Sequence, residues 1–484
     1  MTATALTNPD LLTNPHLWNG TEHSVIELYD DDAEVNLWRK FTLWIVGCYI
    51  VLNVGFVGVR FPPTGAGLPI GEMVLVVSLL MMNFTVIAPR MAREVWLFPM
   101  LVWWGYCLPR ALFDLRVGGA FALRDASQEI ESLFLFVGFW LVNSATRMRY
   151  FFAWLRKILP VIGLYGLLFP IHNRLTAVMP TIPGMNGSER ALFFQMVGTP
   201  TLCIWVATWL LMEGRQGESG STMRYVQAGF LTAWMVAFSQ VRSVYIQILA
   251  MVMILLAVRR RLAGKWITMV LMAILLIGAV SLSGLNLQGR MTKVSLDFVW
   301  RHLESSTGES EGGKTGGAAA GVGQRERWWS HIYEQMRVSR TKMVLGLGFG
   351  MPLTNFGVGG TAPVREPHDS YVSVFARLGI LGILLWVMMQ AALYRAWWRG
   401  HKLCARMGWI RDQNNLMLIM LYGVSMLLLA IAEDAFEKPY MAIPYYLFFG
   451  VLIRYTSFLR EAAADGGPTL EWTEQENEAT ELTQ

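Results

Sequence analysis

Runs of about 20 mostly apolar residues recur along the chain, and this feature constrains the fold more than any other. A helix of that length crosses the hydrocarbon core of a bilayer and satisfies its own backbone hydrogen bonds there. The chain is 54% hydrophobic and only 15% charged, which is too apolar for a soluble protein of 484 residues. These observations predict an all-α integral membrane protein with about twelve transmembrane helices. The expected spans are residues 41–59, 68–88, 95–113, 130–145, 151–170, 191–212, 224–241, 243–258, 266–285, 371–394, 415–433 and 440–458.

The Lys and Arg residues collect in alternate loops, and this pattern predicts the orientation of the chain. Basic residues in short loops stay on the cytoplasmic side of a membrane. The basic loops carry, among others, Arg90, Arg147, Arg259 and Arg399. We therefore expect both termini in the cytoplasm. The formal charge of +5 mostly reflects this pattern, so it gives no support for a nucleic-acid partner, which would need basic residues gathered on one soluble face.

The polar segments divide the chain into five predicted regions. They are a disordered cytoplasmic tail at 1–36, a first membrane region at 37–285, a large outer loop at 286–370, the last membrane helices at 371–460 and a second disordered tail at 461–484. The loop is placed outside because long loops cross a membrane largely regardless of their own charge.

The outer loop changes character along its length. Residues 304–323 are rich in Gly, Ser and Glu, and we expect them to be mobile because they cannot bury enough apolar surface to fold alone. From Gln324 onward, apolar residues recur at helical spacing and predict an amphipathic helix that lies on the bundle or in the interface. These residues are Trp329, Ile332, Tyr333 and Met336. The sequence GLGFGMPL, starting at position 346, then predicts a glycine-rich turn.

His368 is the first catalytic candidate. It directly precedes the apolar helix expected at 371–394, so its ring lies at the outer mouth of a membrane bundle, where ionisable groups usually have a function. Pro367 restrains the backbone before it, and Asp369 and Ser370 are residue types that open helices. Imidazole can accept a proton at neutral pH. The alternative is an interfacial histidine that only neighbours a helix cap.

Three acidic residues reach the same predicted surface. They are Glu433, Asp434 and Glu437. Carboxylates can act as general bases or bind sugar hydroxyls, so they stay open as rival bases or as ligands of an acceptor sugar. Asp369 is a further candidate for a supporting role beside the histidine.

Three arginines on the outer side are candidates for binding an anion. Arg242 stands between two expected spans with almost no loop to solvate it, although a side chain that snorkels to interfacial water would explain it equally well. Arg325 and Arg327 begin the expected amphipathic helix, where a solvated role is the simpler interpretation.

Metal and serine chemistry lack the motifs that they need. The sequence has no H-E-x-x-H pair, no Cys/His ligand cluster and no clear Ser-His-Asp order, so we expect no metal and no cofactor. GESEGGKT at 308–315 has the spacing of a phosphate-binding loop, but it lies in flexible sequence without the strand and helix that such a loop requires.

Three motifs together resemble the superfamily of O-antigen ligases and O-antigen polymerases, which are bacterial membrane glycan transferases. The first motif, PHDSYVSVFARLGILG, resembles the family's P-H-N-S-Y signature with its L-G-x-x-G end. The second, GQRERWW through GLGFG, resembles the family's arginine, tryptophan and glycine-rich turn. The third, VRSVYIQIL, resembles the family's arginine at the outer end of a span. The match is good over about 230–395. By this resemblance Arg242, Arg325 and His368 occupy the family's functional positions, and Arg327 matches less securely. Asp369 stands where the family usually has Asn.

The resemblance implies a GT-C-like fold and a metal-independent glycosyltransferase in the bacterial inner membrane. Such enzymes take a glycan from undecaprenyl diphosphate and add it, with inversion, to an acceptor sugar hydroxyl on the periplasmic side. Arg242 and Arg325 would then hold the diphosphate and His368 would take the acceptor proton. Implied partners are the lipid-linked glycan, an acceptor glycan or lipid A core, membrane lipid, and a chain-length regulator or flippase.

The residues leave the acceptor open. We expect a polymerase for O-antigen or exopolysaccharide, with an O-antigen ligase that uses lipid A core as the alternative. A flippase for lipid-linked glycans is a weaker alternative, because transport paths place charged groups near the membrane midplane whereas these candidates lie at the outer rim.

Overall fold

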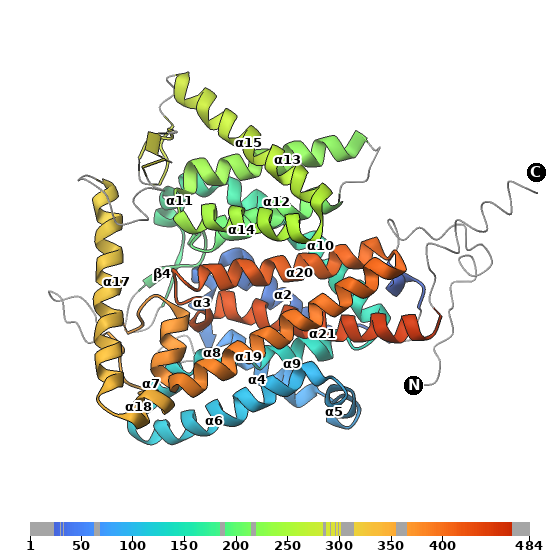
Figure 1. Cartoon of the computed structure of the whole chain (residues 1–484), viewed down its shortest axis with the longest axis vertical. Helices are drawn as coiled ribbons and strands as arrows, with labels where there is room; N and C mark the ends of the chain where they lie inside the picture. Colours follow the sequence, from blue (N-terminus) through green and yellow to red (C-terminus); the bar gives the residue numbers. More distant parts are fainter. Residues whose placement is uncertain are drawn as a thin grey trace, which may run out of the picture.

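The chain folds mainly into helices, as its apolar composition predicts (Figure 1). The computed structural model describes residues 24–29, 31, 33–61, 68–183, 189–213, 219–283, 287–290, 292–295, 297–298, 300–301, 314–354 and 365–466. The helices of the first half are α2 (Leu37–Leu52), α3 (Val54–Val57), α4 (Ile70–Met81), α5 (Phe84–Ala92), α6 (Phe98–Gly118), α7 (Ala120–Asp125), α8 (Ser127–Glu131), α9 (Phe134–Leu141), α10 (Ala145–Leu167), α11 (His172–Val178) and α12 (Thr199–Glu213). Those of the second half are α13 (Ser219–Ser239), α14 (Arg242–Val258), α15 (Arg260–Leu282), α17 (Lys314–Arg337), α18 (Arg340–Leu345), α19 (Ser370–Met407), α20 (Ile410–Leu429) and α21 (Pro439–Ala464).

Short 3₁₀ helices and two small hairpins connect these helices. The 3₁₀ helices are η2 (Val25–Glu27), η3 (Val95–Leu97), η4 (Phe169–Ile171) and η7 (Ala435–Glu437). Strand β1 (Arg60–Phe61) pairs with β2 (Leu68–Pro69), and β3 (Thr181–Pro183) pairs with β4 (Glu189–Ala191), both antiparallel. The hairpins lie in connections between helices, so they alter the all-α prediction only locally.

The described residues confirm several apolar helices but not the predicted count of about twelve spans. Three helices are long and apolar enough to cross a membrane: 262–282 within α15, α19 and α21. Two bent pairs would raise the number to five, namely α4 with α5, bent by 95°, and α10 with 169–178, bent by 47°. α14 is apolar but shorter.

Segment 130–145 is one expected span that does not form a single long helix. Its helical core, α9, has only eight residues, all of them buried. α9 packs so closely on α21 that a Cβ at Gly138 would lie 2.0 Å from the Leu447 carbonyl oxygen. An apolar run of this kind is explained by burial inside the protein, which hydropathy cannot distinguish from burial in lipid.

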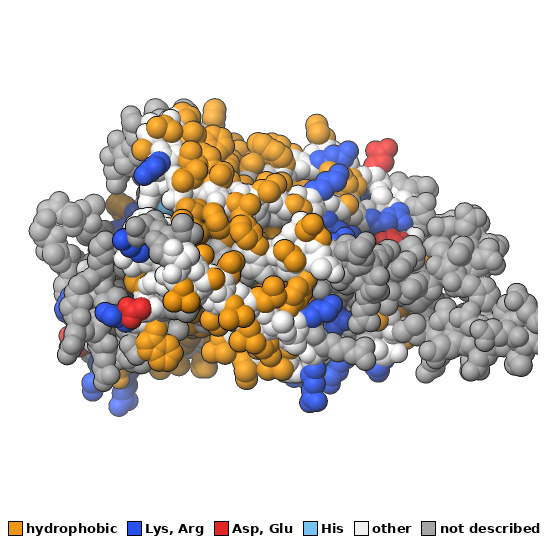
Figure 2. Space-filling view, turned by 90° about the horizontal axis from the view of Figure 1, so that it is seen from above, with side chains coloured by type: hydrophobic (Ala, Val, Ile, Leu, Met, Phe, Trp, Pro, Cys, Tyr) orange, Lys and Arg blue, Asp and Glu red, His pale blue; other side chains and the backbone are white. Residues whose placement is uncertain are grey.

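The packed bundle has two distinct ends. At one end the first described residues are held against the start of α20, where the Val25 N–H donates to Asp412 Oδ2 over 3.0 Å. α20 runs to the other end, where residues 430–438 turn the chain into α21, and α17 lies across this end (Figure 1). Between the ends, hydrophobic side chains cover the face seen in Figure 2, with Lys and Arg toward both ends. Such a band fits a membrane protein; which end faces the cytoplasm stays a prediction from the arginine pattern.

The amphipathic helix α17 differs from the prediction in its start and in its buried face. It begins at Lys314 rather than near Gln324, so part of the segment expected to be mobile is helical, while 304–313 lies outside the described residues. Ile332 and Met336 are buried as expected, but Trp328 replaces Trp329 on the buried stripe and Tyr333 is 50% exposed. The reason is that Trp328, Ile332 and Met336, each four residues after the one before, lie on the side of α17 that faces α19.

A kink in α19 positions the start of this helix. Gly379 has φ +70°, and a Cβ there would lie 2.3 Å from the Val344 carbonyl oxygen. The glycine-rich turn predicted at 346 packs against the kink, because the N–H groups of Leu347 and Gly348 donate to the carbonyl oxygens of Ala376 (2.7 Å) and Arg377 (3.0 Å). The turn therefore satisfies carbonyl groups that the bent helix leaves without their usual helical partners.

A candidate active site beside an arginine-lined pocket

Backbone strain and a helix cap fix His368 immediately before α19. Its φ of +52° is a left-handed conformation that is uncommon for a residue with a side chain. Asp369 holds the next turn in place, since its Oδ1 accepts hydrogen bonds from the N–H groups of Tyr371 (2.9 Å) and Val372 (3.0 Å). Burial raises the pKa of Asp369, while these two hydrogen bonds and the positive charge of Arg325 act in the opposite direction.

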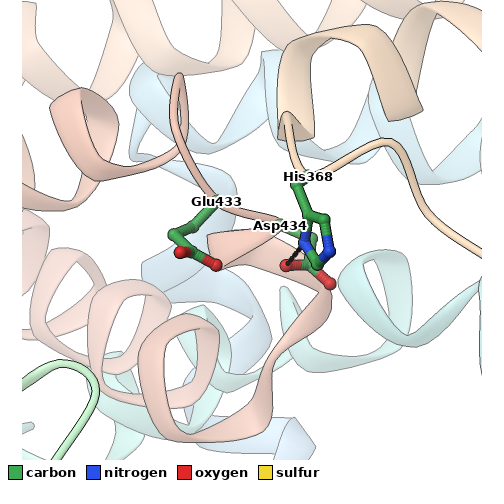
Figure 3. Close-up of side chains that lie close together, drawn as sticks. All are labelled: His368, Glu433 and Asp434. Carbon is green, nitrogen blue, oxygen red and sulfur yellow. Dashed lines mark hydrogen bonds and ion pairs between the residues drawn. The ribbon is translucent and has the colours of Figure 1, made fainter. Parts of the chain in front are cut away.

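The His368 ring is held by Asp434 from the loop between α20 and α21 (Figure 3). His368 Nδ1 lies 3.2 Å from Asp434 Oδ1, and the Trp328 ring of α17 lies 5.9 Å from the imidazole, centroid to centroid. An Nδ1–H donor fits this geometry and leaves Nε2 as the basic nitrogen. Although burial acts to raise the pKa of Asp434, the hydrogen bond with His368 and the charge of Lys438 lower it below its ordinary value. Asp434 is therefore a carboxylate that orients the ring.

His368, Glu433 and Asp434 each offer a ligand atom within 4.8 Å of one another, as a metal site would require. However, the Lys438 ammonium lies 2.8 Å from Glu433 Oε2 and 2.7 Å from Asp434 Oδ1. The two carboxylates share this single positive charge, and a divalent cation bound between them would have to displace it. The cluster thus fits an oriented histidine better than a metal centre.

Glu437 helps to hold the start of α19 against the loop between α20 and α21. Ser370 Oγ donates to Glu437 Oε2 over 3.0 Å and accepts from the Phe436 N–H over 3.1 Å, which joins the loop to the start of α19. Burial, together with the charges of Glu366 and Asp434, raises the pKa of Glu437 well above its ordinary value. Its Oε2 already accepts the hydrogen bond from Ser370 Oγ, so Glu437 is a weaker candidate base than His368.

A pocket of about 660 Å³ opens beside this cluster. Its described lining includes Arg242 at the start of α14, Arg325 of α17, Arg290 from the loop after α15, His172 and Glu433. Arg327 is exposed and is not among the lining residues. Glu433 connects the pocket to His368, since their ligand atoms lie within 4.8 Å. The structure thus brings together Arg242, Arg325 and the His368 cluster from distant parts of the sequence.

The pocket is electrostatically suited to an anion. Three guanidinium groups line it, and Glu433, the carboxylate in its described lining, is already paired with Lys438. Neither Arg290 nor Arg325 makes an ion pair with a described residue. Arg242 also begins a helix, whose N-terminal end favours negative charge.

Sequence reasoning missed Arg290, His172 and Lys438. The predicted topology does put all three on the outer side, but sidedness alone does not distinguish them from solvated residues. The family signatures contain none of them.

Residues 227–387 match the family model described as O-antigen ligase. This match supports a place for the segment in the superfamily of O-antigen ligases and polymerases. No match was found among curated proteins. The family is one of membrane glycosyltransferases, so the matched domain supports an enzyme of this general type. The matched segment carries Arg242, Arg290, Arg325 and His368, whereas Glu433, Asp434 and Lys438 come from the part of the chain that follows it.

Proposed function

We propose that the protein transfers a glycan from undecaprenyl diphosphate to an acceptor sugar hydroxyl on the periplasmic face of the bacterial inner membrane, without a metal and with inversion at the anomeric carbon. The product would be a surface polysaccharide, O-antigen or exopolysaccharide, extended by a GT-C-like polymerase. The observation that carries this proposal is that Arg242 and Arg325 line the same pocket. Glu433 also lines this pocket and lies next to His368.

In the proposed reaction, the two arginines bind the diphosphate and His368 transfers the proton. The guanidinium groups of Arg242 and Arg325 bind the diphosphate oxygens and stabilise the charge of the leaving group. His368 Nε2 takes the proton of the acceptor hydroxyl as its oxygen attacks the anomeric carbon, and the bond from that carbon to the phosphate oxygen breaks with its electron pair going to the phosphate. Asp434 keeps the ring oriented and stabilises the imidazolium that forms.

Purified variants test this division of roles. We expect His368→Ala to lower transfer by at least ~10²-fold while donor binding persists, since a general base typically contributes ~10²–10⁴-fold. Arg242→Ala and Arg325→Ala should weaken donor binding, and lysine at either position should rescue poorly because a point charge cannot replace the planar fork. Arg301→Ala is the matched control, since Arg301 is exposed and paired with Asp297.

Two results would contradict the proposal. Full activity of a folded His368→Ala protein would remove the proposed base, and loss of wild-type activity in a chelator would remove the metal-independent mechanism. Thermal unfolding of each variant separates loss of chemistry from loss of the fold.

The ligase remains the alternative, because the family model is named for it and both activities use the same residues. Envelope glycans of a deletion strain distinguish them on a gel. Single repeats on lipid A core indicate a missing polymerase, whereas chains that accumulate on the undecaprenyl carrier indicate a missing ligase. Glycan transfer in detergent, where no movement across a membrane occurs, excludes a flippase.

A further inference from the structure

The loop after α15 is built to hold one arginine in the pocket. Gln240, 3% exposed and with φ +50°, clamps this loop through both ends of its side-chain amide. Its Nε2 donates to the Thr292 carbonyl oxygen and its Oε1 accepts from the Thr292 N–H, each over 3.0 Å. The contact is close, because a Cβ at Gly289 would lie 2.4 Å from Gln240 Nε2.

Backbone contacts place Arg290 at the end of this clamp. The Gly289 N–H donates to the Thr292 carbonyl oxygen over 2.8 Å, and the Arg290 N–H donates to the carbonyl oxygen of Phe238, in α13, over 3.0 Å. The Arg290 side chain lines the same pocket as Arg242 and Arg325. Arg290 is exposed overall, so it lies at the open side of the pocket, where these contacts fix its backbone.

The number of positive charges exceeds what the bound donor requires. A diphosphate that joins a lipid to a sugar carries two negative charges, one on each phosphate. When the sugar leaves, the terminal phosphate becomes a monoester and gains a third charge, because its second ionisation occurs near pH ~6. Three guanidinium groups match the leaving group rather than the donor.

We propose that Arg290 is a further phosphate-binding residue that stabilises the charge developing on the departing diphosphate, and that Gln240 is its positioning residue. This inference rests on the proposed function and assigns a separate role within it. An interaction that strengthens as the bond breaks raises the rate of the chemical step more than it improves donor binding.

The full-length protein in nanodiscs allows a test that needs no knowledge of the sugar. Undecaprenyl diphosphate and undecaprenyl monophosphate are the two probes, and native mass spectrometry measures their binding. Arg290→Ala should weaken binding of the diphosphate about tenfold and of the monophosphate less than about threefold, as loss of one charged hydrogen-bonding partner implies. Arg301→Ala, the matched control on the same stretch of chain, should leave both unchanged.

The positioning role has its own readout. Gln240→Ala should reduce the preference for diphosphate over monophosphate, and the double variant with Arg290→Ala should bind no worse than Arg290→Ala alone. With lipid-linked glycan as donor, Arg290→Ala should lower kcat more than it raises KM.

The outcomes separate this inference from the proposed function. In one outcome, Arg290→Ala binds both lipids as well as Arg301→Ala does, while Arg242→Ala no longer binds either lipid. This outcome overturns the role of Arg290 and leaves the proposed function standing. Equal loss of both lipids in Arg290→Ala also overturns it, because a general charge effect would then suffice. Unchanged binding in the Arg242, Arg325 and Arg290 variants overturns both.

Discussion

At the scale of single residues, the site depends on Asp434, which the sequence could not distinguish in role from the nearby acidic residues. Asp434 contacts both His368 and Lys438, while its neighbour Glu433 pairs with Lys438 and faces the pocket. Two adjacent residues thus take different positions: Asp434 contacts the proposed base, and Glu433 lines the proposed substrate pocket.

Asp434→Asn should lower transfer at least ~10-fold, a part of the ~10²–10⁴-fold that a general base provides, because the ring loses its charged partner. It should also change stability with pH. A carboxyl with a lowered pKa stabilises the fold fully above the ordinary carboxyl pKa of about 4 and loses this contribution as the pH falls toward its own pKa. The difference in melting temperature between wild type and Asp434→Asn should therefore be constant at neutral pH and shrink below pH ~4.

Asp297→Asn is the control for this comparison, since that carboxylate is 67% exposed and pairs only at the surface with Arg301. A melting difference for Asp434→Asn that grows with acidity would show that Asp434 does not have a lowered pKa.

Asp369 explains how the chain can depart from the family's usual asparagine. Only one of its oxygens, Oδ1, caps both N–H groups at the start of α19. An asparagine carbonyl oxygen can accept the same two bonds, so the departure leaves the position of His368 unaffected.

At the scale of elements, the kink of α19 and the glycine turn form one unit. The turn requires glycine at 346 and the kink requires it at 379, since a Cβ on either would meet the backbone of the other segment within 2.5 Å. This contact fixes the direction of residues 370–378, which begin beside the histidine.

Gly379→Ala should destabilise the protein by ~1–3 kcal/mol and reduce transfer, because alanine is strained at positive φ and its Cβ would overlap the Val344 carbonyl oxygen. The measurement is thermal unfolding in detergent together with the transfer rate. Gly105→Ala in α6 is the matched control, because a Cβ there meets nothing within 4 Å. Equal effects of the two substitutions would contradict a structural requirement for glycine at 379.

At the scale of the whole molecule, a buried ion-pair network ties the site to the first half of the chain. Asp125 of α7 lies 2.8 Å from Arg365 and 3.0 Å from Arg377, and it also accepts the Gly350 N–H over 2.9 Å. Arg377 in turn pairs with Glu366 over 2.7 Å, two residues before the histidine. The site therefore needs the N-terminal helices, although the family match begins at 227.

Asp125→Ala should destabilise the protein by ~3–5 kcal/mol, because Arg365 loses its ion-pair partner and Arg377 keeps only Glu366 of its two. Asp297→Ala removes an exposed partner and should change stability by less than ~1 kcal/mol. Chemical denaturation in detergent measures both. A small effect of Asp125→Ala would show that the segment carrying His368 is held by α19 and its neighbouring loop alone.

The sequence by itself determined the membrane character, the amphipathic helix, the glycine turn and the family, because apolar composition, periodicity and local motifs depend on near neighbours in the chain. Only the tertiary structure decided which apolar runs are buried in protein, that Trp328 rather than Trp329 faces the bundle, and that Arg290, Lys438 and Asp434 complete the site. Apart from the local pair of Lys438 with Asp434, these features depend on contacts between residues tens to hundreds of positions apart, and such contacts leave no periodic trace in a single sequence.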